Sequence, residues 1–324
     1  MYYTVHHVTR FRYSSPISES IMEVRIQPRS EGIQHCLDFQ LHTSPRATIM
    51  TYRSELGNRV HHFNVPNLHS QLTITARALV ELTSPPPLPQ SLSPHAWDEL
   101  DELTSTDEYW DMLKPSHFAR SSDLLQRLAQ ELQLRRRDDP LTVLRDLNTA
   151  LHKTFAYAQK NTRVDSPIDD ALRARRGVCQ DFAHIMITLV RELQIPCRYV
   201  SGYLVSQGRV RDRSADSATH AWAEALLPGL GWVGFDPTNN TIVEDRHIRV
   251  AVGRDYADVP PTRGVFRGNA DSELTVTVNV SSSDESPIHE LPLETDWVPA
   301  NLEGYEHIPG QQQQPQQQQQ AGWP

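Results

Sequence analysis

Three residue types that together perform thiol chemistry follow one another in the second half of the chain, and the first of them is a cysteine. Cys179 lies in RRGVCQDFAHIMITLV, where Gly177 ends one turn and an amphipathic run begins. The spacing predicts a helix over 179–195 with the thiol in its first turn. Unpaired N–H groups and the positive end of the helix dipole lower the pKa of a thiol placed there and favour the nucleophilic thiolate.

A histidine and an aspartate follow on two expected strands. His220 opens THAWAEALL, and Asp236 ends the strand part of GWVGFDPT. A four-residue turn, PGLG, separates the two segments, so we expect antiparallel neighbours with the imidazole and the carboxylate side by side. Cys179 as nucleophile, His220 as base and then acid, and Asp236 as the group that fixes the imidazole tautomer satisfy the triad logic of thiol acyl transfer.

Acyl transfer also needs donors for the oxyanion. The backbone N–H of Cys179 at the helix start is one natural donor. The second stays open: Gln180 follows the nucleophile, while Tyr157 and Gln159 lie upstream in FAYAQ.

The sequence gives less reason to place two tryptophans and two further cysteines in the active site. Trp222 and Trp232 could line a substrate cleft for an acyl chain or fill the core. Cys36 and Cys197 are expected to be packing residues, because a free cysteine is commonly a small buried hydrophobe. His184 is five residues beyond the nucleophile and so points to another side of the helix, which favours a core or supporting role.

The elements that must position these residues divide into four segments. Residues 1–83 read as short alternating strands broken by Pro, Gly and Asn, which predicts an all-β sandwich. Residues 84–110 begin with SPPPLPQSLSP and are expected to be a linker. Residues 111–280 combine amphipathic helices with later strands and form the expected catalytic core. Residues 281–324 are polar and end in QQQQPQQQQQ, which predicts a disordered tail.

The composition favours a soluble globular protein. The chain has 324 residues, 38% hydrophobic and 22% charged, with a net charge of -9. That charge offers no attraction to nucleic acid or to an anionic membrane. The first residues lack the pattern of a signal peptide, and no apolar run approaches a membrane span of roughly 18 residues. With three cysteines and no disulfide pattern, we expect a cytoplasmic protein.

Beyond the individual residues, three blocks carry a family resemblance: GVCQDFAH, CRYVSGYL and HAWAEALLPGLGWVGFDPT. They resemble the transglutaminase-like superfamily, specifically its microbial members, which pair a papain-like core with an N-terminal β-domain. YTVHHVTRFRYSSPI and IQPRS resemble that β-domain, and AVGRDYADVPPTRGVFRG resembles the family segment beyond the aspartate. The resemblance covers most of residues 1–280. It implies an α+β fold, with a papain-like transglutaminase core preceded by an antiparallel β-sandwich, and catalytic roles for Cys179, His220 and Asp236.

The expected activity is acyl transfer on amide bonds of a peptide or protein substrate, through a thioester. Water as acceptor makes the enzyme a peptidase or amidase, and an amine makes it a transglutaminase. The resemblance favours hydrolysis. Two alternatives are a catalytically inert peptide-binding module and a zinc hydrolase that uses the same three residues as ligands. No CxxC, HExxH or calcium-loop spacing is present, so we expect neither a metal nor a cofactor; the oligomeric state is open.

Overall fold

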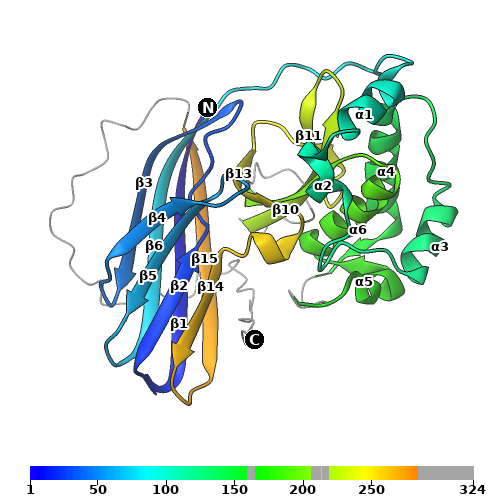
Figure 1. Ribbon diagram of the computed structural model, residues 1–324. Coiled ribbons are helices and arrows are strands. Elements are labelled where there is room, and N and C mark those ends of the chain that lie inside the picture. The colour runs from blue at the N-terminus through cyan, green and yellow to red at the C-terminus, as the bar shows by residue number, and fades with distance from the viewer. Residues whose placement is uncertain (159–164, 206–212, 214–218, 284–324) are drawn as a thin grey trace.

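A computed structural model describes residues 1–158, 165–205, 213 and 219–283. It shows a β-sandwich on one side and, on the other, a core of helices packed on a second sheet, whose strands β10 and β13 lie on the side toward the sandwich (Figure 1). The predicted α+β class is therefore confirmed. Gln159, the polar loop 206–218 apart from Arg213, and the predicted tail beyond residue 283 lie outside the described residues.

The sandwich has two four-stranded antiparallel sheets. One has the order β15-β1-β6-β3, with β1 Tyr2–Ile17, β3 Gln34–Ser44, β6 His69–Leu82 and β15 Ser272–Ser283. The other has the order β14-β2-β5-β4, with β2 Glu19–Val24, β4 Ile49–Arg53, β5 Arg59–Val65 and β14 Thr262–Arg267. Period-2 alternation in β1 buries every second side chain over most of its length. Phe11, Phe63, Leu72 and Ile74 fill the space between the sheets.

Two strands of the sandwich come from the far end of the chain. Both β14 and β15 lie within 111–280, the range that the sequence analysis gives to the core, apart from the last residues of β15. However, β14 pairs with β2 and β15 pairs with β1 along nearly its whole length. The chain thus forms the core first and then returns to the sandwich to add its last two strands. The sequence pattern indicates a strand in ELTVTVNV but holds no information on its distant partner.

The segment 84–110 is more ordered than a linker. It contains helix α1, Ala96–Thr104, and the start of a short helical stretch formed by η1 Asp107–Tyr109 and α2 Trp110–Leu113. Ala96 and Leu100 are buried, and Leu88, Leu92 and Trp97 pack against the core. The Pro-rich part therefore runs over the surface, but its apolar side chains are anchored by hydrophobic burial.

The core packs helices against a five-stranded antiparallel sheet. The helices are α3 Asp123–Glu131, α4 Pro140–Thr154, α5 Ile168–Ala174 and α6 Cys179–Glu192. The sheet has the order β12-β11-β10-β9-β13, with β9 Cys197–Leu204, β10 Thr219–Leu227, β11 Gly231–Asp236, β12 Thr241–Ile242 and β13 His247–Gly253. Remaining elements are β7 Ala156–Tyr157, β8 Arg176–Gly177 and η2 Tyr256–Asp258. Helix α6 packs on β9 and β10, where small alanines of β10 allow close approach.

The sandwich docks on β13, which is an edge strand of the core sheet. The side-chain amide of Asn58 donates to the Val252 carbonyl at 2.7 Å and accepts from the Val252 N–H at 2.9 Å. Gln34 makes the same two-way contact with Arg249, at 2.8 Å in both directions. The two amides therefore satisfy the exposed edge of β13 as a neighbouring strand would.

No helix among the described residues is long and apolar enough to cross a membrane.

Candidate active site

Cys179 is the first residue of α6, as predicted. The Asp181 carboxylate accepts a hydrogen bond from the Val178 N–H at 2.8 Å and so caps the helix start. A side chain at Gly177 would place its Cβ 2.5 Å from Asp181 Oδ2, so only glycine leaves room for this cap. The thiol is half-buried. The local sequence therefore holds Cys179 at the positive end of a helix while keeping it accessible.

The predicted oxyanion residues lie around the same loop. Tyr157 in β7 pairs with Gly177 in β8, and the Ala158 N–H donates to the Gly177 carbonyl at 2.9 Å. Gln180 is buried as the second residue of α6. Gln180 is thus next to Cys179 in the chain, the β7–β8 pairing brings Tyr157 to the same loop, and the oxyanion role of both residues stays a prediction.

His220 and Asp236 lie side by side, as the strand arrangement predicts. Strands β10 and β11 are antiparallel neighbours, and His220 Nε2 is 2.8 Å from Asp236 Oδ2. Both side chains are completely buried. In this environment the hydrogen bond and the charge attraction are much stronger than in water.

The Asp236 carboxylate is held from several directions. Its Oδ1 accepts from the backbone N–H groups of Thr238 and Asn239, at 3.1 and 3.2 Å. Its Oδ2 accepts from the Asn239 side chain at 2.8 Å, and His247 Nε2 lies 3.3 Å away. Burial alone would raise the pKa of Asp236, but the charge and hydrogen bond of His220, followed by the hydrogen bond of His247, outweigh burial and hold this pKa well below its usual range.

The same pair controls the protonation of His220. Burial alone would lower the pKa of the imidazole, but the Asp236 carboxylate and the Cys179 thiol group outweigh burial and raise it to about 10. At neutral pH the ring is therefore an imidazolium. Asp236 occupies Nε2 and the buried Nδ1 atom makes no hydrogen bond within the described residues, while Cys179 is near enough to raise the pKa of the ring.

The residues that could bind a metal ion differ from the three that the zinc alternative names. Among the described part of the chain, His220, Asp236 and His247 form a group with ligand-type atoms within 4.8 Å of one another, and Cys179 is not in it. The two histidine nitrogens are hydrogen-bonded to one carboxylate oxygen at 2.8 and 3.3 Å. The ligand atoms that a zinc ion would need are therefore already hydrogen-bonded to one another.

Family comparisons agree with this geometry. Residues 126–237 match the model of the transglutaminase-like superfamily, and residues 3–81 match the bacterial transglutaminase-like N-terminal region. The chain belongs to the transglutaminase-like superfamily. The core match begins in α3 and ends just after Asp236, so it includes all three predicted catalytic residues.

Two mycobacterial relatives match most of this chain, and a third relative matches part of it. An uncharacterized protein of Mycobacterium tuberculosis is 34% identical over 304 residues, covering 89% of this chain and 95% of the relative. An uncharacterized protein of Mycobacterium leprae is 33% identical, covering 86% and 97%. A protein-glutamine gamma-glutamyltransferase of Pseudomonas aeruginosa is 30% identical over 154 residues, which are 44% of this chain and 23% of that protein.

A solved structure shares the fold. The structure of a candidate cysteine protease from Cytophaga hutchinsonii superposes with a TM-score of 0.67 at 22% identity, covering 89% of this chain and 93% of that one. The likeness covers most of both chains, so it concerns the fold of the sandwich and of the core together.

The tryptophans do not line an open cleft. Trp222 is fully buried, with its ring centroid 6.2 Å from that of His220, and it packs against Val200 and Val252. It is a core residue that supports the histidine. Trp232 lies at the other end of the sheet, paired with Leu226, and the Arg198 guanidinium covers its ring. Among the described residues, neither tryptophan is therefore found beside the triad as part of an open cleft, and the cleft role is not supported.

The remaining cysteines have no catalytic surroundings. Burial raises the pKa of Cys36 to about 11 and that of Cys197 to about 12. Both stay protonated at neutral pH, in agreement with packing roles. His184 stacks on Phe118, and its Nε2 accepts from the Tyr256 N–H at 3.2 Å, which confirms a core role.

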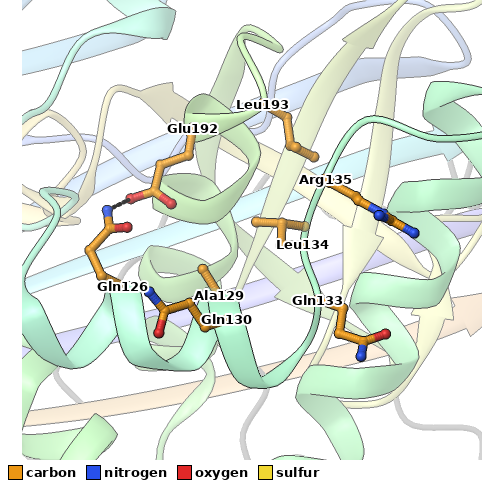
Figure 2. A pocket seen from close by; sticks show the side chains of 8 residues that line it. All are labelled: Gln126, Ala129, Gln130, Gln133, Leu134, Arg135, Glu192 and Leu193. Atoms are coloured by element: carbon orange, nitrogen blue, oxygen red, sulfur yellow. Dashed lines mark hydrogen bonds between the residues drawn. The ribbon is translucent and has the colours of Figure 1, made fainter.

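A pocket of about 520 Å³ lies at the other end of α6 from Cys179 (Figure 2). It lies between α3 and the C-terminal end of α6, where Gln126 donates to Glu192 at 2.7 Å. Helix α6 has 14 residues, so this end is about 20 Å from Cys179. The pocket is therefore separate from the candidate active site.

Two residues that contact the triad were missed by sequence reasoning. Asn239 follows Asp236 in the turn DPTNN, and His247 opens β13 in the way that His220 opens β10. The repeated pattern of a histidine at the start of an apolar strand was a usable signal for His247. Its contact with Asp236 depends on sheet topology, which the pattern does not contain.

Proposed function

We propose that the protein catalyses cysteine-dependent acyl transfer on amide bonds of peptides or proteins, with water as the usual acceptor. One observation carries the proposal: a buried imidazole lies between Asp236 and the thiol at the start of α6. The membership of the transglutaminase-like superfamily supports the same chemistry.

The residues act in two stages. The Cys179 thiolate attacks the amide carbonyl, and the N–H of Cys179 donates to the oxyanion that forms. As the C–N bond breaks, the His220 imidazolium gives its Nδ1 proton to the leaving nitrogen, and a thioester remains on the sulfur. Neutral His220 then takes a proton from water, whose oxygen attacks the thioester. Cleavage of the C–S bond releases the acid and restores the thiolate–imidazolium pair.

Asp236 stays ionised throughout this cycle. It fixes the imidazole with Nε2 toward the carboxylate and stabilises the positive charge on the ring whenever His220 holds the extra proton.

Amine transfer is the second candidate function. The triad serves it equally well, because an amine can replace water in the second stage. The relative from Pseudomonas aeruginosa is named a protein-glutamine gamma-glutamyltransferase. It matches part of this chain, which supports amine transfer as a second candidate function. The fold neighbour from Cytophaga hutchinsonii is named a candidate cysteine protease, in line with hydrolysis.

The test incubates casein with the protein, with and without the fluorescent amine monodansylcadaverine, and uses Cys179→Ala as the matched control. Mass spectrometry then counts cleaved bonds, deamidated glutamines and amine adducts. Hydrolysis predicts cleavage or deamidation that requires Cys179, with few adducts. Adducts as the main Cys179-dependent product would assign the transferase. Products that are identical in Cys179→Ala would contradict both and favour an inert binding module.

A further inference from the structure

His247 is a second histidine on the Asp236 carboxylate. It begins β13, and its Nε2 lies 3.3 Å from the same Oδ2 atom that binds His220. Its side chain is almost completely buried, and its ring meets the face of Trp222 edge-on at 5.2 Å between centroids. Because a carboxylate oxygen only accepts, His247 Nε2 carries the hydrogen and donates it.

Charge balance gives the two histidines different protonation states. The charged groups that act on His247 are Asp236, His220 and Arg246. Burial is the largest influence and lowers the pKa of His247, while Asp236 opposes this effect. One carboxylate cannot balance two buried imidazolium ions, so the ring that lies nearer, His220, takes the proton. His247 is a neutral donor that neither gives nor takes a proton.

The N-terminal sandwich fixes the strand that carries this donor. Gln34 contacts the backbone of Arg249, two residues after His247, and Asn58 contacts that of Val252. On its other side β13 pairs with β9, where His247 lies opposite Leu204. The strand is therefore held on both edges, and the imidazole has a fixed place relative to Asp236.

We propose that His247 is a positioning residue that orients the Asp236 carboxylate toward His220, and that the docked sandwich keeps His247 in place. The proposal rests on the proposed thiol chemistry, since orientation of Asp236 affects catalysis only through His220 and Cys179. It gives the N-terminal module a supporting part in the active site, through β13 and His247.

The experiment measures the rate at which iodoacetamide alkylates Cys179 at pH 7 in the full chain. His247→Phe keeps an aromatic ring but removes the donor, and His247→Gln keeps an N–H close to the position of Nε2. Since a hydrogen bond to a charged group is lost, we expect His247→Phe to react about tenfold more slowly and His247→Gln to recover most of the rate. His7→Phe is the matched control, because His7 is equally buried but hydrogen-bonds to Tyr203 and Thr9. It should alkylate at the wild-type rate.

A double-mutant cycle separates positioning from a general loss of packing. If His247 acts through Asp236, then His247→Phe slows alkylation in the wild type but has no further effect in Asp236→Asn. An equal slowing in both backgrounds would overturn the proposal, as would a wild-type rate in folded His247→Phe.

His220→Ala distinguishes failure of this inference from failure of the proposed function. If His220→Ala slows alkylation while His247→Phe does not, only the positioning role is wrong. If neither variant slows it, the thiol chemistry itself is contradicted, and the positioning role falls with it.

Discussion

Asp236→Asn removes one negative charge from the site with almost no change in shape. In the wild type the pKa of His220 is raised from 6.5 to about 10. A tenfold change in proton affinity corresponds to about 1.4 kcal/mol, so the imidazolium is stabilised by about 5 kcal/mol relative to an exposed histidine. With the charge gone, burial becomes the dominant influence on His220 and favours the neutral ring.

The expected result is a large loss of thiol reactivity at neutral pH. We expect the iodoacetamide rate of Cys179 at pH 7 to fall at least tenfold and up to about 1000-fold in Asp236→Asn, because no imidazolium remains to stabilise the thiolate. Cys36 and Cys197 serve as internal controls within the same samples, because their raised pKa values keep both unreactive at pH 7.

The same variant changes how stability depends on pH. The raised pKa of His220 means that its contribution is complete below about pH 6.5 and is lost as the pH rises toward 10. The lowered pKa of Asp236 means that its contribution is present above about pH 4 and is lost as the pH falls below that value. Thermal unfolding of the wild type should therefore show both declines, and Asp236→Asn should show a flatter profile. A wild-type alkylation rate at pH 7 in the folded variant would refute this account of the pair.

Two further substitutions test the supporting structure. Gly177→Ala places a Cβ against the Asp181 carboxylate, so we expect a loss of about 1–3 kcal/mol in unfolding free energy by urea titration, together with slower alkylation at the helix start. Glu224→Gln leaves Arg198 and Arg249 without their shared buried carboxylate, so we expect a loss of about 3–5 kcal/mol in the same assay. A urea midpoint equal to that of the wild type in either variant would contradict the corresponding contact.

Local patterns in the sequence were sufficient for many of the elements and for the pairing of His220 with Asp236. The alternation in β1 predicts a half-buried strand, and the apolar spacing after Gly177 predicts that α6 begins at Cys179. A four-residue turn between two strands places His220 beside Asp236 without any long-range information. These inferences succeeded because each depends on residues that are close together in the chain.

Long-range contacts could not be predicted in the same way. The pairing of β15 with β1 joins residues more than 250 positions apart, for which a single sequence carries no signal. The burial of Trp222 and the contact of His247 with Asp236 depend on the order of strands in the core sheet. Helix α1 was hidden by the prolines just before it, although its buried face is apolar.

The central claim is that Cys179 accepts an acyl group, and trapping that intermediate tests it most directly. The native protein is treated with p-nitrophenyl acetate at neutral pH, quenched in acid, and digested for peptide mass spectrometry. We predict an acetyl thioester on Cys179 that hydroxylamine removes, that is absent in Cys179→Ala, and that forms much more slowly in His220→Ala. Acetylation of other side chains only, or an equal yield in His220→Ala, would contradict the account.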